Sequence, residues 1–227
     1  MQADVTGRSV GGHGLGYNVK SVVMDKRDRF KAYYKSAGGA EGLPWHRDEP
    51  TRFLDAIIAS RGKLGSAVDL GCGSGIDAVY LARAGWTVTA LDFMPDALEM
   101  TRKLAEQAGV DLELVQADVM EWEPGREFDV VVDSGLLHNL SRDHISGYRA
   151  NILKWLAAEG DFILAHWESR TDSDRLRGGA RRVSRKQIID LFAPELKEHQ
   201  FERLEATGLP ERVGPDLSVG FYHFRRR

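Results

Sequence analysis

The sequence predicts an α/β protein with a mostly parallel sheet, and two observations support this fold class. Short apolar runs typical of buried strands alternate with helical patterns between residues 67 and 165. The first run leads through a glycine-rich turn into a helix, which is the arrangement of a nucleotide-type binding loop. Parallel strands joined by right-handed crossovers place the ligand crevice at their carboxyl ends. We therefore expect a ligand site at that edge of the sheet.

Each element follows from a local pattern. Spaced apolar residues among dense charges indicate a helix over residues 20–36, and Asp48-Glu49-Pro50-Thr51 is expected to begin a helix that runs to Ser60. Pro95 opens a helix that ends before Gly109. Further helices are expected over residues 77–84, 143–157 and 184–192, and strands over residues 67–70, 86–91, 112–116, 128–132, 161–165, 197–205 and 218–225.

Length and composition indicate one ordinary globular domain. The chain has 227 residues, of which 42% are hydrophobic and 29% are charged. A net charge of -3 gives no case for a nucleic-acid or membrane partner. The one cysteine, Cys72, excludes an internal disulfide, and no apolar run reaches the length of a membrane span, so we expect a cytoplasmic protein. A monomer and a homodimer fit the sequence equally well.

The glycine-rich turn narrows the class of nucleotide ligand. Gly71, Gly73 and Gly75 have the spacing GxGxG, and Ile76 stands where a dinucleotide fingerprint needs its third glycine. A phosphate-binding P-loop is excluded because no Gly-Lys-Ser/Thr follows. Asp69 would repel a pyrophosphate, whereas it would suit a ligand with an amino group and a sulfonium.

The pattern Asp-x-Gly-x-Gly-x-Gly resembles the first motif of class I S-adenosylmethionine-dependent methyltransferases, and three later features strengthen the resemblance. Asp92 closes a second apolar strand, where a carboxylate can accept hydrogen bonds from both hydroxyls of a ribose. The resemblance implies that role for Asp92, and it places Asp118 beside the adenine amino group. It also places the reaction centre at the end of the strand that reaches Asp133 and Ser134. The resemblance covers roughly residues 65–164.

The resemblance also implies an architecture and a cofactor. The fold is expected to be a Rossmann-like sandwich with a mostly parallel seven-stranded sheet and an antiparallel C-terminal hairpin. S-adenosyl-L-methionine is the expected cofactor, with S-adenosyl-L-homocysteine as product and no metal. Residues 1–18 are expected to be a flexible glycine-rich tail, residues 19–62 helices that form a lid, and residues 63–227 the cofactor-binding domain.

Candidate residues for binding the methyl acceptor lie both before the glycine-rich turn and after the reaction-centre strand. Pro44-Trp45 followed by an acid and a proline resembles a segment of the tellurite-resistance and thiopurine methyltransferases, in which the tryptophan packs beside the cofactor. Aromatic rings suit that place because a ring face attracts the sulfonium cation. His138 follows the reaction-centre strand and is the best candidate for a general base or for a group that orients the acceptor. Each aromatic or histidine candidate also fits an ordinary packing role.

The candidate site consists of the following residues. The catalytic candidates are His138 and Asp133. The cofactor candidates are Asp69, Gly71, Cys72, Gly73, Gly75, Asp92, Phe93, Asp118, Val119 and Asp133. The acceptor candidates are Tyr33, Tyr34, Trp45, His46, Ser134, His138, His166 and Trp167.

The leading hypothesis is methyl transfer to N, O or S of a small molecule. The sequence lacks the Asn/Asp-Pro-Pro-aromatic motif of amino-methylating DNA enzymes at residues 133–136, which disfavours a nucleic-acid acceptor. One alternative is a non-catalytic cofactor binder, and another is an enzyme that uses the cofactor for a different reaction. The arginines of residues 169–185 fit either a lid that attracts an anionic acceptor or a solvated loop.

Overall fold

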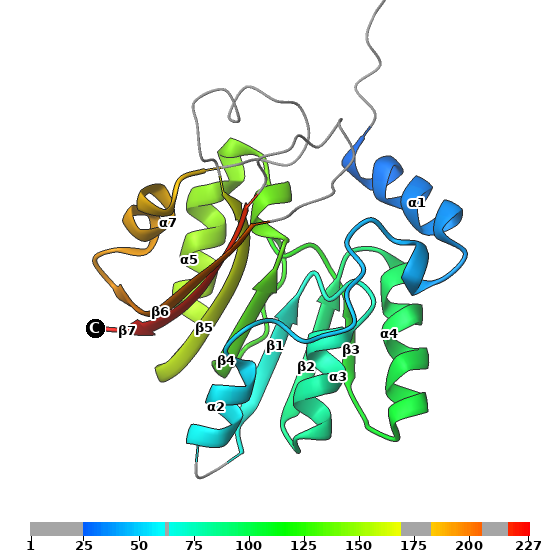
Figure 1. Cartoon of the computed structure of the whole chain (residues 1–227), viewed down its shortest axis with the longest axis horizontal. Coiled ribbons are helices and arrows are strands. Elements are labelled where there is room, and N and C mark those ends of the chain that lie inside the picture. The colour runs from blue at the N-terminus through cyan, green and yellow to red at the C-terminus, as the bar shows by residue number, and fades with distance from the viewer. Residues whose placement is uncertain (1–24, 62–63, 169–182, 206–217) are drawn as a thin grey trace, which may run out of the picture.

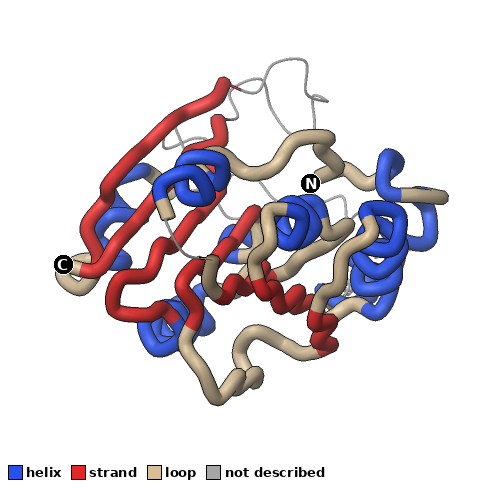
Figure 2. Tube along the Cα trace, turned by 90° about the horizontal axis from the view of Figure 1, so that it is seen from below, coloured by secondary structure: helices blue, strands red, loops and turns tan. Residues whose placement is uncertain are grey.

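The computed structural model describes residues 25–61, 64–168, 183–205 and 218–227 (Figure 1). Its strands form one seven-stranded sheet in the order β3-β2-β1-β4-β5-β7-β6. The strands are β1 Ser66–Leu70, β2 Thr87–Asp92, β3 Glu113–Gln116, β4 Phe128–Ser134, β5 Leu156–Glu168, β6 Leu196–Glu205 and β7 Ser218–Arg226. Helices lie on both sides of the strands (Figure 2). This is the predicted architecture.

The helices of the described residues are mostly those that the sequence predicts. The α-helices are α1 Lys26–Ala37, α2 Leu54–Ser60, α3 Ile76–Arg83, α4 Pro95–Ala108, α5 Ile145–Trp155 and α7 Arg185–Phe192. Three 3-10 turns are η1 Ala40–Gly42, η2 Leu137–Asn139 and η3 Arg142–His144. In α4 the proline at the first turn and left-handed Gly109 at the C-cap mark the expected ends.

The pairing of the strands fixes where a ligand can bind. Strands β1 to β5 pair with one another in parallel, and β7 pairs antiparallel with both β5 and β6. The order of the strands reverses between β1 and β4, so their carboxyl ends form the topological switch point of the sheet. The glycine-rich turn and the end of β4 lie at this point.

Alternate residues of the central strands face two hydrophobic cores. One core packs α5 and α7 against the sheet, and the other packs α2 and α3 against the opposite face. Val131 faces the first core, while its neighbours Val130 and Val132 face the second. Leu54 and Ile57 of α2 therefore lie in the same core as the buried side chains of α3.

The second helix begins later than predicted. The sequence places its start at residues 48–51, but the α-helix begins at Leu54, after Phe53 in a left-handed conformation with φ 76°. Thr51 donates its backbone N–H and its hydroxyl to Asp77, at 2.7 Å each. These long-range bonds tie Thr51 to the first turn of α3, and residues 48–53 form bends and a turn where the local pattern favours a helix start.

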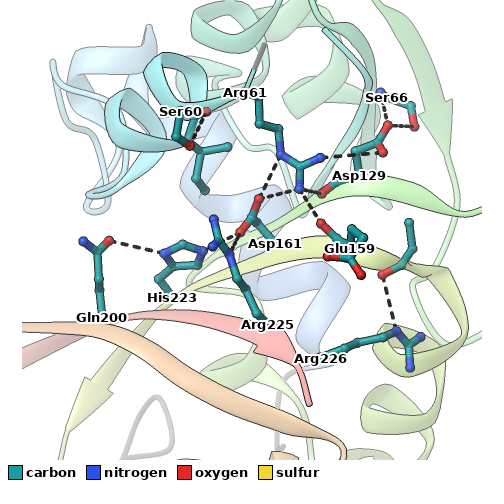
Figure 3. Close-up of polar contacts among 12 residues, drawn as sticks. Ser60, Arg61, Ser66, Asp129, Glu159, Asp161, Gln200, His223, Arg225 and Arg226 are labelled. Atoms are coloured by element: carbon teal, nitrogen blue, oxygen red, sulfur yellow. Dashed lines mark hydrogen bonds and ion pairs between the residues drawn. The ribbon is translucent and has the colours of Figure 1, made fainter. Parts of the chain in front are cut away.

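A polar network holds the sheet together at the end opposite the glycine-rich turn (Figure 3). Asp161 of β5 is fully buried and accepts hydrogen bonds from Arg61, His223 and Arg225. Burial opposes ionisation of this carboxylate, but the hydrogen bonds from His223, Arg225 and Arg61 prevail and lower its pKa below the ordinary value. The network ties the end of α2 to β5 and β7.

Candidate active site

The glycine-rich turn is a tight backbone loop between β1 and α3. Gly71, Gly73 and Gly75 all have positive φ angles, of 68°, 56° and 85°. A Cβ on Gly75 would lie 2.9 Å from the Cα of Thr101, and one on Gly71 would lie 2.8 Å from a side-chain carbon of Leu136. Both positions therefore require glycine, because packing as well as φ excludes a side chain.

Asp92, at the end of β2, reaches back to this turn. Its Oδ2 accepts the N–H of Gly73 at 3.1 Å, and its Oδ1 accepts the N–H of Met94 at 2.9 Å. Burial raises the pKa of Asp92 to about 6, and the backbone hydrogen bonds limit the rise. Each carboxylate oxygen retains a second lone pair, so Asp92 can still accept two hydroxyl groups.

Asp69, on β1 just before the glycine-rich turn, is bonded within the protein itself. It is buried and accepts the N–H of Ala78 in the first turn of α3 at 3.2 Å. Burial raises its pKa, and the neighbouring Asp77 raises it further. This geometry favours a role in holding the loop to the helix over direct contact with a cofactor.

Asp118 lies at the edge of the candidate site, beyond the end of β3. Its Oδ1 accepts the N–H of Met120 at 3.0 Å, and its Oδ2 lies 3.6 Å from Nη2 of Arg27 on α1. The adjacent Val119 is buried in the α5 core and its carbonyl accepts from Asn151. The side chain of Asp118 is therefore partly exposed and can contact a ligand, whereas the side chain of Val119 is part of the core.

An aromatic cluster of α1 and the following loop covers the glycine-rich turn. Trp45 has its ring centre 5.5 Å from Phe30, 5.4 Å from Tyr33 and 5.6 Å from Tyr34. The indole Nε1 lies 3.5 Å from the point where a Cβ on Gly73 would be. The cluster continues to Phe93, which packs edge-on against Phe30 at 5.7 Å. His46 instead pairs with the exposed Asp48. Figure 1 shows α1 above the carboxyl end of the sheet, beside α4.

Asp133 has a structural environment that the sequence did not indicate. The carboxylate is fully buried and accepts backbone N–H groups of Gly135, Leu136 and Leu137 as well as the hydroxyl of Tyr148. Burial raises its pKa to about 6, against the lowering effect of these bonds. The arrangement favours a role in shaping the turn after β4 over the predicted catalytic role.

The turn that Asp133 shapes presents His138. The imidazole of His138 stacks on Trp167 with 4.9 Å between ring centres and 25° between planes, and His166 meets it edge-on at 5.5 Å. Nδ1 of the buried His166 lies 2.6 Å from the carbonyl oxygen of Trp167, so this nitrogen carries the proton. A Cβ on Gly135 would lie 3.0 Å from His138, so the missing side chain lets the ring lie against the turn. Three of the predicted acceptor residues, His138, His166 and Trp167, are thus in contact with one another.

Three residues at the site were missed by sequence reasoning. Asp77, in the first turn of α3, is buried and accepts from Arg47 and Thr51. The Thr51 hydroxyl also lies 3.0 Å from Oγ of Ser134, at the end of β4. The sequence shows that Arg47 is close to Trp45 and that Asp77 is close to Gly75. Neither fact predicts that Arg47 and Asp77 pair with each other.

The structure also limits other kinds of chemistry at this edge. Cys72 is buried with its Sγ 3.5 Å from the Thr101 hydroxyl, and burial raises the pKa of the thiol, which disfavours a nucleophilic role. Among the described residues, no group of three or more His, Cys, Asp or Glu side chains could hold a metal ion.

No helix within the described ranges is long and apolar enough to cross a membrane. Of the arginine-rich segment 169–185, residues 169–182 lie outside the described residues, as does the glycine-rich tail, residues 1–18.

Comparison with known proteins agrees with this geometry. Residues 67–160 match the family model described as "Methyltransferase domain". A curated relative, the 2-heptyl-1-hydroxyquinolin-4(1H)-one methyltransferase of Mycobacteroides abscessus, is 27% identical over 61% of this chain and 63% of its own length. The chain thus spans less than two thirds of that relative.

Two solved structures share the fold. One, described as "Conversion of a Disulfide Bond into a Thioacetal Group during Echinomycin Biosynthesis", has a TM-score of 0.68 and 23% identity, and covers 89% of this chain and 93% of its own. The other is the 1,6-didemethyltoxoflavin-N1-methyltransferase of Burkholderia thailandensis, with a TM-score of 0.60, 22% identity, and 88% and 87% coverage. The glycine-rich turn and Asp92 both lie within residues 67–160, the part of the chain that matches the methyltransferase model.

Proposed function

We propose that this protein transfers a methyl group from S-adenosyl-L-methionine to N, O or S of a small-molecule acceptor. The observation that carries the proposal is the positive-φ glycine turn at the switch point, joined to Asp92 by the Gly73 N–H. Relatives support it: the quinolone enzyme is a methyltransferase by name, and the toxoflavin enzyme is described with S-adenosylhomocysteine and its acceptor bound.

The residues present fit this cofactor. Asp92 has spare acceptor capacity for the ribose hydroxyls, Asp118 is exposed enough to reach an adenine amino group, and the missing Cβ of Gly73 lets the Trp45 indole lie close to the turn. The bound cofactor would supply an electrophilic methyl group on a sulfonium. Trp45, with the rings around it, would attract that cation and exclude water.

His138 is the residue we assign to the acceptor. Its imidazole is held by Trp167 and His166 on the β4 side of the switch point, so it can orient an acceptor or take its proton. Positioning alone contributes several kcal/mol when the reacting atoms are held about 3 Å apart. Asp133 and Tyr148 keep the turn that carries His138 in place. We also propose a cytoplasmic location and an acceptor other than nucleic acid, on the acidic composition.

The test is transfer from labelled S-adenosylmethionine to a panel of thiols, phenols, heteroaryl amines and inorganic chalcogen anions, with cofactor affinity measured in parallel. We expect transfer to one acceptor class. His138→Ala should lower kcat at least tenfold while the cofactor Kd stays within twofold. The exposed His144, in η3, provides the control: His144→Ala should leave both quantities unchanged. Absence of cofactor binding by the wild-type protein would overturn the proposal.

A further inference from the structure

An ion-pair latch crosses the switch point and connects the aromatic cluster to the cofactor loop. Its members are Arg47, Thr51 and Asp77. The carboxylate of Asp77 faces both terminal nitrogens of Arg47, with Nη1 at 3.0 Å from Oδ1. The same carboxylate accepts the N–H and the hydroxyl of Thr51, both at 2.7 Å. Residues 47 and 51 thereby become fixed to the first turn of α3.

The burial of the latch makes these contacts strong. The side chain of Asp77 is fully buried, whereas that of Arg47 is 33% exposed. A desolvated carboxylate needs charged or polar donors, and a bidentate guanidinium satisfies it more strongly than neutral groups do. Loss of Arg47 would leave Asp77, among the described residues, with the two donors of Thr51. The segment that precedes Thr51 would then lose its attachment to the cofactor loop.

The latch lies between the two halves of the candidate site. Asp77 follows the glycine-rich turn by two residues, and the Thr51 hydroxyl reaches Ser134 at the end of β4. On the other side, Trp45 precedes Arg47 by two residues and lies against Gly73. The position of the indole over the turn is thus set by the latch on one side and by the rings of α1 on the other.

We propose that Asp77, with Arg47 and Thr51, is a positioning residue that sets cofactor affinity by holding Trp45 over the glycine-rich turn. The latch acts through the indole and makes no contact with the cofactor itself. This inference rests on the proposed function, because it requires the cofactor to bind at the turn. It adds a determinant of affinity that lies outside the family motif.

The test measures the Kd of S-adenosylhomocysteine by calorimetry, together with the midpoint of thermal unfolding. Arg47→Ala should raise the Kd at least fivefold. The control is Arg52→Ala, in the same segment, whose guanidinium pairs with Glu202 at 3.5 Å on the surface and has no contact with Asp77. We expect no change of Kd in this control.

The same substitution in Trp45→Phe protein tells whether Arg47 acts by positioning the Trp45 side chain or by stabilising the fold in general. In Trp45→Phe protein, Arg47→Ala should change the Kd by less than twofold, because the group that the latch positions is already altered. Equal effects of Arg47→Ala in both backgrounds would overturn the proposal, as would an unchanged Kd in the wild-type background. If Arg47→Ala does not fold, Arg47→Lys, which keeps the charge but loses the two-pronged contact, carries the same thresholds.

The failure of this inference is distinct from the failure of the proposed function. If the wild-type protein does not bind S-adenosylhomocysteine, the proposed function fails. If the wild-type protein binds it and Arg47→Ala binds it equally well, only the latch fails.

Discussion

The pH dependence of cofactor binding is a direct consequence of the environment of Asp92. Burial raises the pKa of this carboxyl from its ordinary 3.8 to about 6. Ribose hydroxyls donate hydrogen bonds to the ionised form, so binding should favour the carboxylate and weaken as pH falls through about 6. At pH 7 about ten in eleven molecules carry the ionised form, and at pH 5 about one in eleven does. If only that form binds, the Kd rises about tenfold from pH 7 to pH 5, or about 1.4 kcal/mol.

The assay is calorimetric titration with S-adenosylhomocysteine between pH 5 and pH 7, a range in which the α-amino group of the ligand stays protonated. In Asp92→Asn protein the affinity should be weaker and independent of pH. A flat profile for the wild-type protein would refute the reasoning. So would a slope that persists in Asp92→Asn, because the titrating group would then be a different one, with Asp133, whose pKa is also about 6, the first to be tested.

Two further predictions concern stability and reactivity. Asp161→Asn should reduce the free energy of unfolding in urea by about 1.5–3 kcal/mol, because it removes the charged acceptor that Arg61, His223 and Arg225 share. The pKa of Asp161 is lowered, so its contribution is present above the ordinary pKa of 3.8 and is lost as pH falls below it; a neutral replacement without measurable cost would contradict this account. Cys72, the one cysteine, should not react with a chromogenic disulfide reagent at pH 8 until the protein is unfolded, because burial raises the pKa of its thiol. Rapid stoichiometric labelling of the native protein would show that the turn opens.

The sequence by itself determined the fold and the cofactor loop. Alternation of strand and helix patterns specifies a parallel sheet, since the period of apolar residues reflects local geometry and burial. The glycines at 71 and 75 could be recognised because positive φ and close packing leave no other residue type. Asp92 could be placed because it ends a strand next to the loop. These patterns depend on residues that are close in the sequence, so they predict where the strands, the glycine-rich turn and Asp92 lie.

Only the tertiary structure decided the roles of the buried carboxylates. Asp133 satisfies three backbone N–H groups and Tyr148, and Asp77 meets Arg47 from thirty positions earlier in the chain. A sequence pattern shows that a carboxylate lies near the site, but the donors that reach it depend on the packing of distant segments. The same contacts delayed the start of α2 to Leu54. A buried charge takes its role from the partners that compensate for the loss of water, and those partners are fixed only when the chain is folded.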